Sequence, residues 1–167
     1  MKSMTSLAFV AVVTLQGSLF TGSVHATDSS EVFTKGEMLL VHKSPTCGCC
    51  SGWVEHMQMH GAQTKVSHPA NLNLLKSELG IPGNARSCHT AVSKDGYVFE
   101  GHIPAKFIQQ YLANPTPKTK GLVVPAMPVG SPGMEYNGQF MPYAVHLLHD
   151  DGSLSEYANV MSPEDQV

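Results

Sequence analysis

The chain has 167 residues and a formal net charge of −3 at pH 7, with 14% charged residues and no run of lysine or arginine. This balance argues against a nucleic-acid partner, because such a partner requires clustered positive charge. Nine methionines, nine histidines and four cysteines supply many soft and borderline metal ligands. The composition therefore favours metal handling, although any single methionine more often fills a gap in the core.

The first 26 residues have the pattern of a secretory signal peptide. Lys2 supplies a positive charge, residues 7–15 are apolar, and Val24-His25-Ala26 places small residues at the two positions that signal peptidase reads. The apolar run is shorter than the roughly 20 residues that span a bilayer. We therefore expect export, cleavage after Ala26 and no membrane span in the mature chain. A retained membrane anchor is the alternative.

A folded domain is expected over residues 37–160, after a polar and flexible segment at 27–36. Its first strand, residues 38–42, is followed by Cys47-Gly48-Cys49-Cys50 and by a helix predicted over 53–60. Three thiols thus lie at or near a helix N-terminus, where the macrodipole and free N–H groups favour the thiolate. Thiolates attack disulfides and bind soft metals, so this turn is the expected centre of the chemistry.

The predicted helix has one apolar face and one pair of histidines. Trp53, Val54 and Met57 are spaced to face the core. His56 and His60 are four residues apart and share a face. Such a pair can hold a metal, but it is more often a solvated face, because no third ligand lies nearby in the sequence.

The next segments predict a strand, a helix, a β-hairpin and a further helix. Their ranges are 63–67 for the strand, 72–79 for the helix, a hairpin from Cys88 to residue 100, and 105–112 for the last helix. The resulting order β-α-β-α-β-β-α, with a cysteine motif at the start of the first helix, matches the thioredoxin arrangement. The predicted class is therefore α/β, as one thioredoxin-like domain, which alone does not establish function.

The composition changes after residue 112. Residues 114–120 have the character of a proline-rich linker, and the run 121–135 contains three prolines, three glycines and two methionines, which predicts no regular element. A long ordered loop is commonly functional, so Met127 and Met134 are either thioether ligands or side chains that pin the loop to the core. A last strand over 143–148 and a turn at 150–152 close the domain.

The four cysteines suit copper better than zinc. Cu(I) is soft, prefers thiolate and thioether sulfur and accepts low coordination numbers. Cys47, Cys49 and Cys50, with Cys88 from a neighbouring strand, exceed the needs of one Cu(I), and thiolates can bridge several ions in a cluster. Four cysteines can also make a closed tetrahedral zinc site, but the adjacent Cys49 and Cys50 fit poorly on one tetrahedron with Cys47.

A second hypothesis is thiol–disulfide exchange. Cys47 and Cys50 form a C-x-x-C pair at a helix start, the arrangement of thiol–disulfide oxidoreductases. Cys49 argues against simple exchange, because a third thiol would scramble a mixed disulfide. A third hypothesis is that all four cysteines form structural disulfides in an exported domain. The copper-binding and redox hypotheses can coexist, since thiols that bind copper can also pass electrons to a copper ion, which would make an oxidoreductase that acts on copper ions. A store, a chaperone and a copper oxidoreductase all remain open.

Several motifs in order resemble the CopG-like copper-resistance family of exported bacterial proteins. They are Cys47-Gly48-Cys49-Cys50 with Trp53-Val54, Gly80-Ile81-Pro82, Ser87-Cys88-His89-Thr90-Ala91, Gly101-His102-Ile103-Pro104-Ala105, and the run 121–135. The resemblance covers roughly residues 37–149. It implies a thioredoxin-like fold, a Gram-negative periplasmic setting, copper ions as the ligand and other copper-handling proteins of the periplasm as partners.

The resemblance also points to particular ligands. It implies that the thiols of Cys47, Cys49, Cys50 and Cys88 bind copper, with His89 beside them. Further candidate ligands are Met127, Met134 and His102. One departure is Ala126, where the family pattern leads us to expect glycine. The extra methyl group would affect the backbone of that loop alone.

Overall fold

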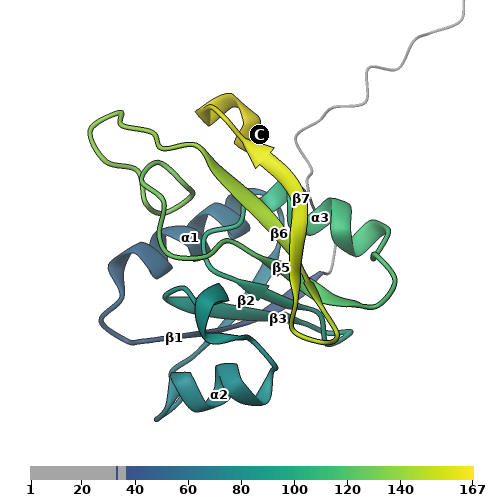
Figure 1. The fold of residues 1–167 in the computed structure, drawn as a ribbon. Coiled ribbons are helices and arrows are strands. Elements are labelled where there is room, and N and C mark those ends of the chain that lie inside the picture. Colours follow the sequence, from purple (N-terminus) through teal and green to yellow (C-terminus); the bar gives the residue numbers. More distant parts are fainter. Residues whose placement is uncertain (1–32, 34–36) are drawn as a thin grey trace, which may run out of the picture.

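A mixed seven-stranded sheet runs through the part of the chain that the structure describes (Figure 1). The structure is a computed structural model, and it describes residue 33 and residues 37–167. The expected signal peptide at 1–26 lies outside the described residues, as does nearly all of the expected flexible segment at 27–36. Both stay predictions.

Helices and strands follow one another in the predicted order through the first two thirds of the domain. In chain order the elements are β1 (Met38–Lys43), α1 (Gly48–Met59), β2 (Gln63–Ser67), α2 (Leu72–Glu78), the 3₁₀ turn η1 (Gly83–Ala85), β3 (His89–Ser93), β4 (Val98–Glu100), α3 (Ala105–Ala113), β5 (Thr119–Val123), β6 (Tyr143–His149), β7 (Leu154–Val160) and the 3₁₀ turn η2 (Pro163–Gln166).

The strands are arranged in the order β2-β1-β3-β4-β5-β6-β7. Strand β1 pairs parallel with β2 and antiparallel with β3, and β3 pairs antiparallel with β4. Strand β5 then pairs parallel with β4 and antiparallel with β6, and β7 completes an antiparallel hairpin with β6. A mixed α/β fold is therefore confirmed, with a sheet that extends three strands beyond β4.

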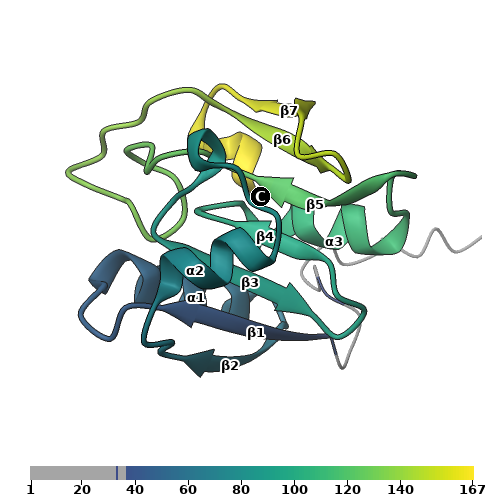
Figure 2. The same ribbon diagram turned by 60° about the horizontal axis from the view of Figure 1, so that its bottom comes forward.

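The three α-helices cover the two faces of the sheet. Figures 1 and 2 show α2 on one face and α1 and α3 on the other. The larger core lies under α1 and α3, and its biggest buried side chains are those of Leu39, Trp53, Met57, Phe99, Ile103, Ile108, Tyr111 and Leu122. A smaller core lies on the α2 side and consists of Ile81, Ala85, Val98, Val123 and Leu148. The predicted inward stripe of α1 is confirmed, because Trp53, Val54 and Met57 are all buried.

The second half of the domain differs from the prediction. Thr119–Val123 is a strand, although the sequence predicts a linker to residue 120 and no regular element from 121 to 135. Gly121 is needed there because β4 and β5 approach closely: at its φ of +151°, a Cβ atom would lie 1.8 Å from the carbonyl oxygen of Val98. The sequence prediction also missed β7, of whose seven residues three are exposed, three are partly buried and one, Val160, is buried. The glycine marks a close strand contact where the sequence suggests a loop.

Among the described residues, no helix is long and apolar enough to cross a membrane.

Candidate metal centre

The turn between β1 and α1 places three cysteines at the start of the helix. Helix α1 begins at Gly48, five residues earlier than predicted, because the Cys47 Sγ atom accepts the N–H of Cys50 at 3.3 Å and caps the first turn. Cys49 and Cys50 therefore lie within that first turn. The buried Trp53 holds the helix in place, and its indole N–H donates to the carbonyl oxygen of Ile103 at 2.9 Å.

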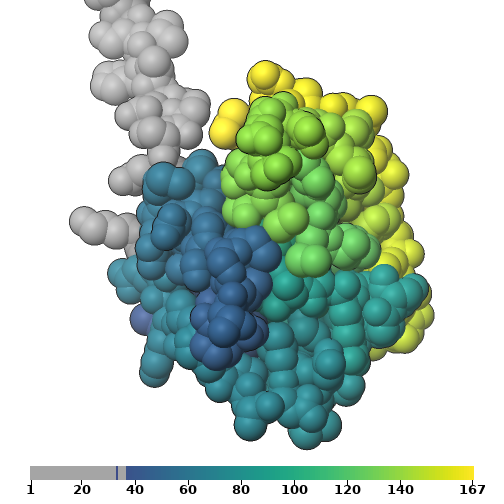
Figure 3. Space-filling view, turned by 90° about the vertical axis from the view of Figure 1, so that its left-hand side faces the viewer, coloured from purple at the N-terminus to yellow at the C-terminus, as the bar shows by residue number. Residues whose placement is uncertain are grey.

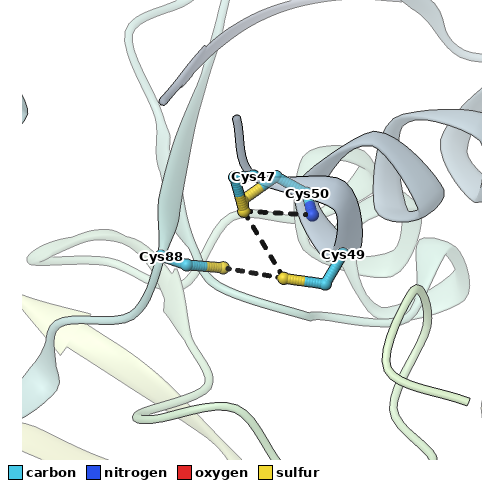
Figure 4. A group of neighbouring side chains, drawn as sticks. All are labelled: Cys47, Cys49, Cys50 and Cys88. Carbon is cyan, nitrogen blue, oxygen red and sulfur yellow. Dashed lines mark hydrogen bonds between the residues drawn. A yellow bond between two sulfur atoms is a disulfide. The ribbon is translucent and has the colours of Figure 1, made fainter. Parts of the chain in front are cut away.

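The fourth cysteine comes from the residue that precedes β3. Strand β3 pairs with β1 so that His89 lies opposite Lys43, which places Cys88 beside the turn after β1. The Cys88 Sγ atom lies 3.9 Å from that of Cys49, which in turn lies 3.4 Å from that of Cys47. All four sulfur atoms lie within 4.8 Å of one another (Figure 4). The structure thus brings together four thiols from two places in the sequence, and such a group can hold a metal ion.

Two of the four cysteines are joined in this structure. Cys47 and Cys50 form a disulfide, whereas Cys49 and Cys88 are free (Figure 4). Cys50 is completely buried, and Cys47 is partly exposed. A four-thiolate site therefore requires two-electron reduction of this disulfide, and the pair is placed to accept those electrons.

Two histidines extend the cluster on the side of Cys88. The Cys88 Sγ atom lies 3.0 Å from Nε2 of His102 and 3.3 Å from Nδ1 of His89. The Nδ1–H group of His102 donates to the carbonyl oxygen of Pro132 at 2.8 Å, which leaves the lone pair of Nε2 facing the sulfur. A second hydrogen bond of this kind is how metal-binding imidazoles are usually oriented. The Nε2 atom of His89 is buried and has no hydrogen-bond partner among the described residues.

Burial shifts the protonation of these groups toward their neutral forms. It lowers the pKa of His102, although the bond to Pro132 opposes the shift, and it lowers the pKa of His89 further, with His102 and Lys76 adding to the effect. Burial, with the neighbouring Cys49, raises the pKa of Cys88 to about 12. Near pH 7 both imidazoles keep a free lone pair, and Cys88 must release a proton when it binds a metal.

The long loop between β5 and β6 forms the remaining wall of the site. Figure 3 shows this loop in green against the start of α1 in dark blue, with the chain around β3 in teal below them. Within the loop, Met127 is 49% exposed, and the backbone of Met134 is bonded to Gly130 and Ser131. Ala126 has a φ of +60°, a region that favours glycine. The methyl group of Ala126 therefore strains the loop backbone, in line with the departure noted in the sequence.

The His56–His60 pair on α1 serves the fold. The two rings lie 4.3 Å apart. The Nε2 atom of His56 accepts the N–H of Ala105 at 3.1 Å, and Nδ1 of His60 is bonded to the carbonyl oxygen of His56. His56 thus caps the first turn of α3, with its Nε2 atom occupied by that bond.

A buried polar network behind Cys88 escaped the sequence analysis. Lys76 on α2 pairs with Glu100 on β4, and both are bonded to the backbone of Ser87. One signal was present in the sequence. Lys76 falls four residues after Leu72 on the apolar side of the predicted helix, where a lysine needs a partner.

Two solved structures, described as copper resistance protein CopG in forms 1 and 2, are similar to this chain. Each is 37% identical to it, and the alignments cover 74% of this chain and 96% and 98% of the two relatives, with TM-scores of 0.69 and 0.70. The chain belongs to the CopG copper-resistance family. A family model described as "Protein of unknown function, DUF411" also matches residues 85–134, which include Cys88, His89 and His102. The comparison with curated proteins gives no match.

Proposed function

We propose that this protein is a periplasmic copper-binding protein of copper resistance and that it binds Cu(I) through Cys47, Cys49, Cys50 and Cys88. The observation that carries the proposal is the convergence of four sulfur atoms within 4.8 Å of one another. Sulfur is the donor that Cu(I) prefers, and bridging thiolates let four sulfurs hold several ions. The CopG relatives are copper-resistance proteins by description, which supports copper as the ion.

Zinc is the less favoured ion. Thiolates around one tetrahedral zinc would lie about 3.8 Å apart, so the distances of 3.4 Å and 3.9 Å from the Cys49 sulfur to those of Cys47 and Cys88 suit either metal. The number of donor atoms distinguishes a copper site from a zinc site. With His89 and His102 beside Cys88, the site offers six donors, more than the four positions of a structural zinc site. His89 and His102 are the proposed nitrogen ligands, and Met127 and Met134 are the proposed thioether ligands from the loop.

The fold and the location belong to the same proposal. We assign β1 to α3 a thioredoxin-like architecture, supported by the strand order β2-β1-β3-β4 and by the cysteine motif at the start of α1. Export follows from the pattern of residues 1–26, and other copper-handling proteins of the periplasm are the proposed partners. An intact mass equal to that of a chain beginning at Thr27 would support the cleavage. Recovery of the uncleaved chain in membranes would contradict it.

Thiol–disulfide exchange is the second candidate function. The disulfide between the partly exposed Cys47 and the buried Cys50 favours it, because a reductant can reach Cys47 and release Cys50 as the leaving thiolate. The same reduction generates the full set of copper ligands. A copper store, a copper chaperone and an oxidoreductase that acts on copper ions would all use these residues.

Metal stoichiometry tests the proposal. The fully reduced protein is titrated with Cu(I) without oxygen, in parallel with protein whose Cys47–Cys50 disulfide is intact. We expect more than one copper per reduced chain and a smaller load on the oxidised protein. One zinc per chain and no retained copper would indicate a structural zinc site. No bound metal, together with reductase activity, would favour the exchange function.

A further inference from the structure

Helix α2 is docked through a lysine. Lys76 is the buried residue of this seven-residue helix, and it is 1% exposed. Lysine is almost never fully buried unless its ammonium group is paired. Figure 2 shows α2 lying across the face of the sheet opposite α1, so the lysine approaches β4 from the α2 face.

The ammonium group of Lys76 meets a buried carboxylate. It forms an ion pair with Glu100 on β4, whose side chain is fully buried. Glu100 also accepts the hydroxyl of Thr90 and the N–H of Ser87, the latter at 2.7 Å. Lys76 in turn donates to the carbonyl oxygen of Ser87 at 3.0 Å. The pair therefore binds both backbone polar groups of Ser87.

Ser87 is held from a third direction as well. Its hydroxyl donates to the carbonyl oxygen of Ala126 in the long loop. Thus α2, β4 and the loop each bind one polar group of the residue that precedes Cys88. Cys88 itself lies before β3, which begins at His89, so the sheet ladder does not fix it directly.

We propose that the buried Lys76–Glu100 ion pair is a positioning device that holds Cys88 against Cys49 and thereby sets the capacity of the metal site. The inference rests on the copper function proposed above. A buried pair of this kind adds little net stability compared with apolar side chains of the same volume, and its better-attested use is to specify one arrangement. Here that arrangement is the 3.9 Å separation between the Cys88 and Cys49 sulfur atoms.

The variant Lys76→Met tests the role of the ion pair, because methionine is an unbranched side chain only one heavy atom shorter than lysine and carries no charge. With the Cys47–Cys50 disulfide intact, only Cys49 and Cys88 are free to react with iodoacetamide, and peptide masses distinguish them. We expect the ratio of Cys88 to Cys49 labelling, measured without copper, to rise by about fivefold or more as the Cys88 segment loosens. After reduction, the Cu(I) load should fall to that of Cys88→Ser.

Lys94→Met is the matched control. The Lys94 side chain is 60% exposed, it pairs with Glu37 at 3.9 Å, and it follows the end of β3 opposite to the end that Ser87 precedes. It should leave both the labelling ratio and the copper load unchanged. An unchanged ratio and an unchanged load in Lys76→Met would overturn the proposal.

Removing one partner of a buried pair can prevent folding, and the double variant Lys76→Met/Glu100→Gln covers that outcome. It leaves no unpaired charge and keeps an acceptor for Ser87 N–H. We expect its labelling ratio to lie above that of the native protein. A folded double variant that matches the native protein in both readouts would also overturn the proposal. Since labelling needs no copper, a native protein that binds none would refute the copper function and leave the test of positioning intact.

Discussion

The backbone of Gly133 packs against the backbone of Gly52, so that a Cβ atom on Gly52 would lie 3.1 Å from the Gly133 Cα atom. This contact seats the long loop on the first turns of α1, next to Cys49. The preceding residue, Pro132, accepts the hydrogen bond that orients His102. The loop and the helix can therefore form one wall of the metal site only if both residues stay small.

Gly133→Ala should open this wall. At the φ of +82°, its Cβ atom would lie 2.4 Å from the carbonyl oxygen of Cys49, so the loop must move away from the helix. Gly138→Ala is the control, because Gly138 lies in the same loop at a φ of +67° and an added Cβ atom there would meet no other part of the protein within 4 Å. Each variant should lose about 1–2 kcal/mol of stability from its positive φ. Only Gly133→Ala should also lose copper, as measured by metal content after anaerobic loading. Equal copper loads in the two variants would contradict the shared wall.

Acid should destabilise the fold through His56. Burial, and secondarily the neighbouring His60, lowers the pKa of His56 from 6.5 to about 4. The folded protein thus binds the proton less tightly than the unfolded chain does, so the stabilisation is complete above pH 6.5 and is lost as the pH falls toward 4. The loss should reach at most about 3 kcal/mol, as measured by denaturant unfolding at several pH values.

His56→Gln separates this effect from that of other buried histidines. The glutamine carbonyl can still accept the N–H of Ala105, so the cap of α3 is kept while the titration is removed. The slope of the free energy of unfolding against pH between 4 and 6.5 should flatten. The slope that remains should come from His89 and His102. A slope as steep as that of the native protein would show that His56 does not titrate in this way.

The first half of the fold could be predicted because its signals are local. A short run of apolar residues marks β1, the side chain of Asn71 caps α2 by accepting Leu74 N–H, and Gly96 closes the β3–β4 turn. Strand β5 could not be predicted in the same way. Its Gly121 is selected by the approach of β4, a contact between residues 23 positions apart that leaves no local pattern.

The metal centre likewise has a part that local sequence signals predict and a part that depends on tertiary contacts. Cys47, Cys49 and Cys50 form a local motif, and the order of elements is enough to bring Cys88 near them. The orientation of His102 depends on Pro132, 30 residues later, which no spacing rule connects to it. The hold on Ser87 depends on three segments that meet only in the folded chain. Sequence patterns indicate which residues can ligate, and tertiary contacts decide how those ligands are aimed.

Cys49 has the position expected of a bridging ligand. Its sulfur lies 3.4 Å from that of Cys47 and 3.9 Å from that of Cys88, close to both, and it takes no part in the disulfide. Ser51 offers a control in the same turn, because it is exposed and its hydroxyl donates only to the carbonyl oxygen of Cys47. A change at Ser51 should leave all four sulfurs in place.

Cys49→Ser should therefore separate copper binding from disulfide exchange. Exchange needs one attacking and one resolving thiol, which Cys47 and Cys50 supply, so reductase activity should be kept or improved when the third thiol is removed. A bridged copper cluster needs the Cys49 sulfur, so the variant should lose copper and give less copper tolerance in a sensitive host, whereas Ser51→Ala should behave as the native protein. Serine is nearly isosteric and Cys49 is partly exposed, so the stability cost should stay within about 1 kcal/mol, and circular dichroism would confirm that the fold is kept. Full copper load and full tolerance in Cys49→Ser would refute the cluster and favour exchange at the Cys47–Cys50 pair.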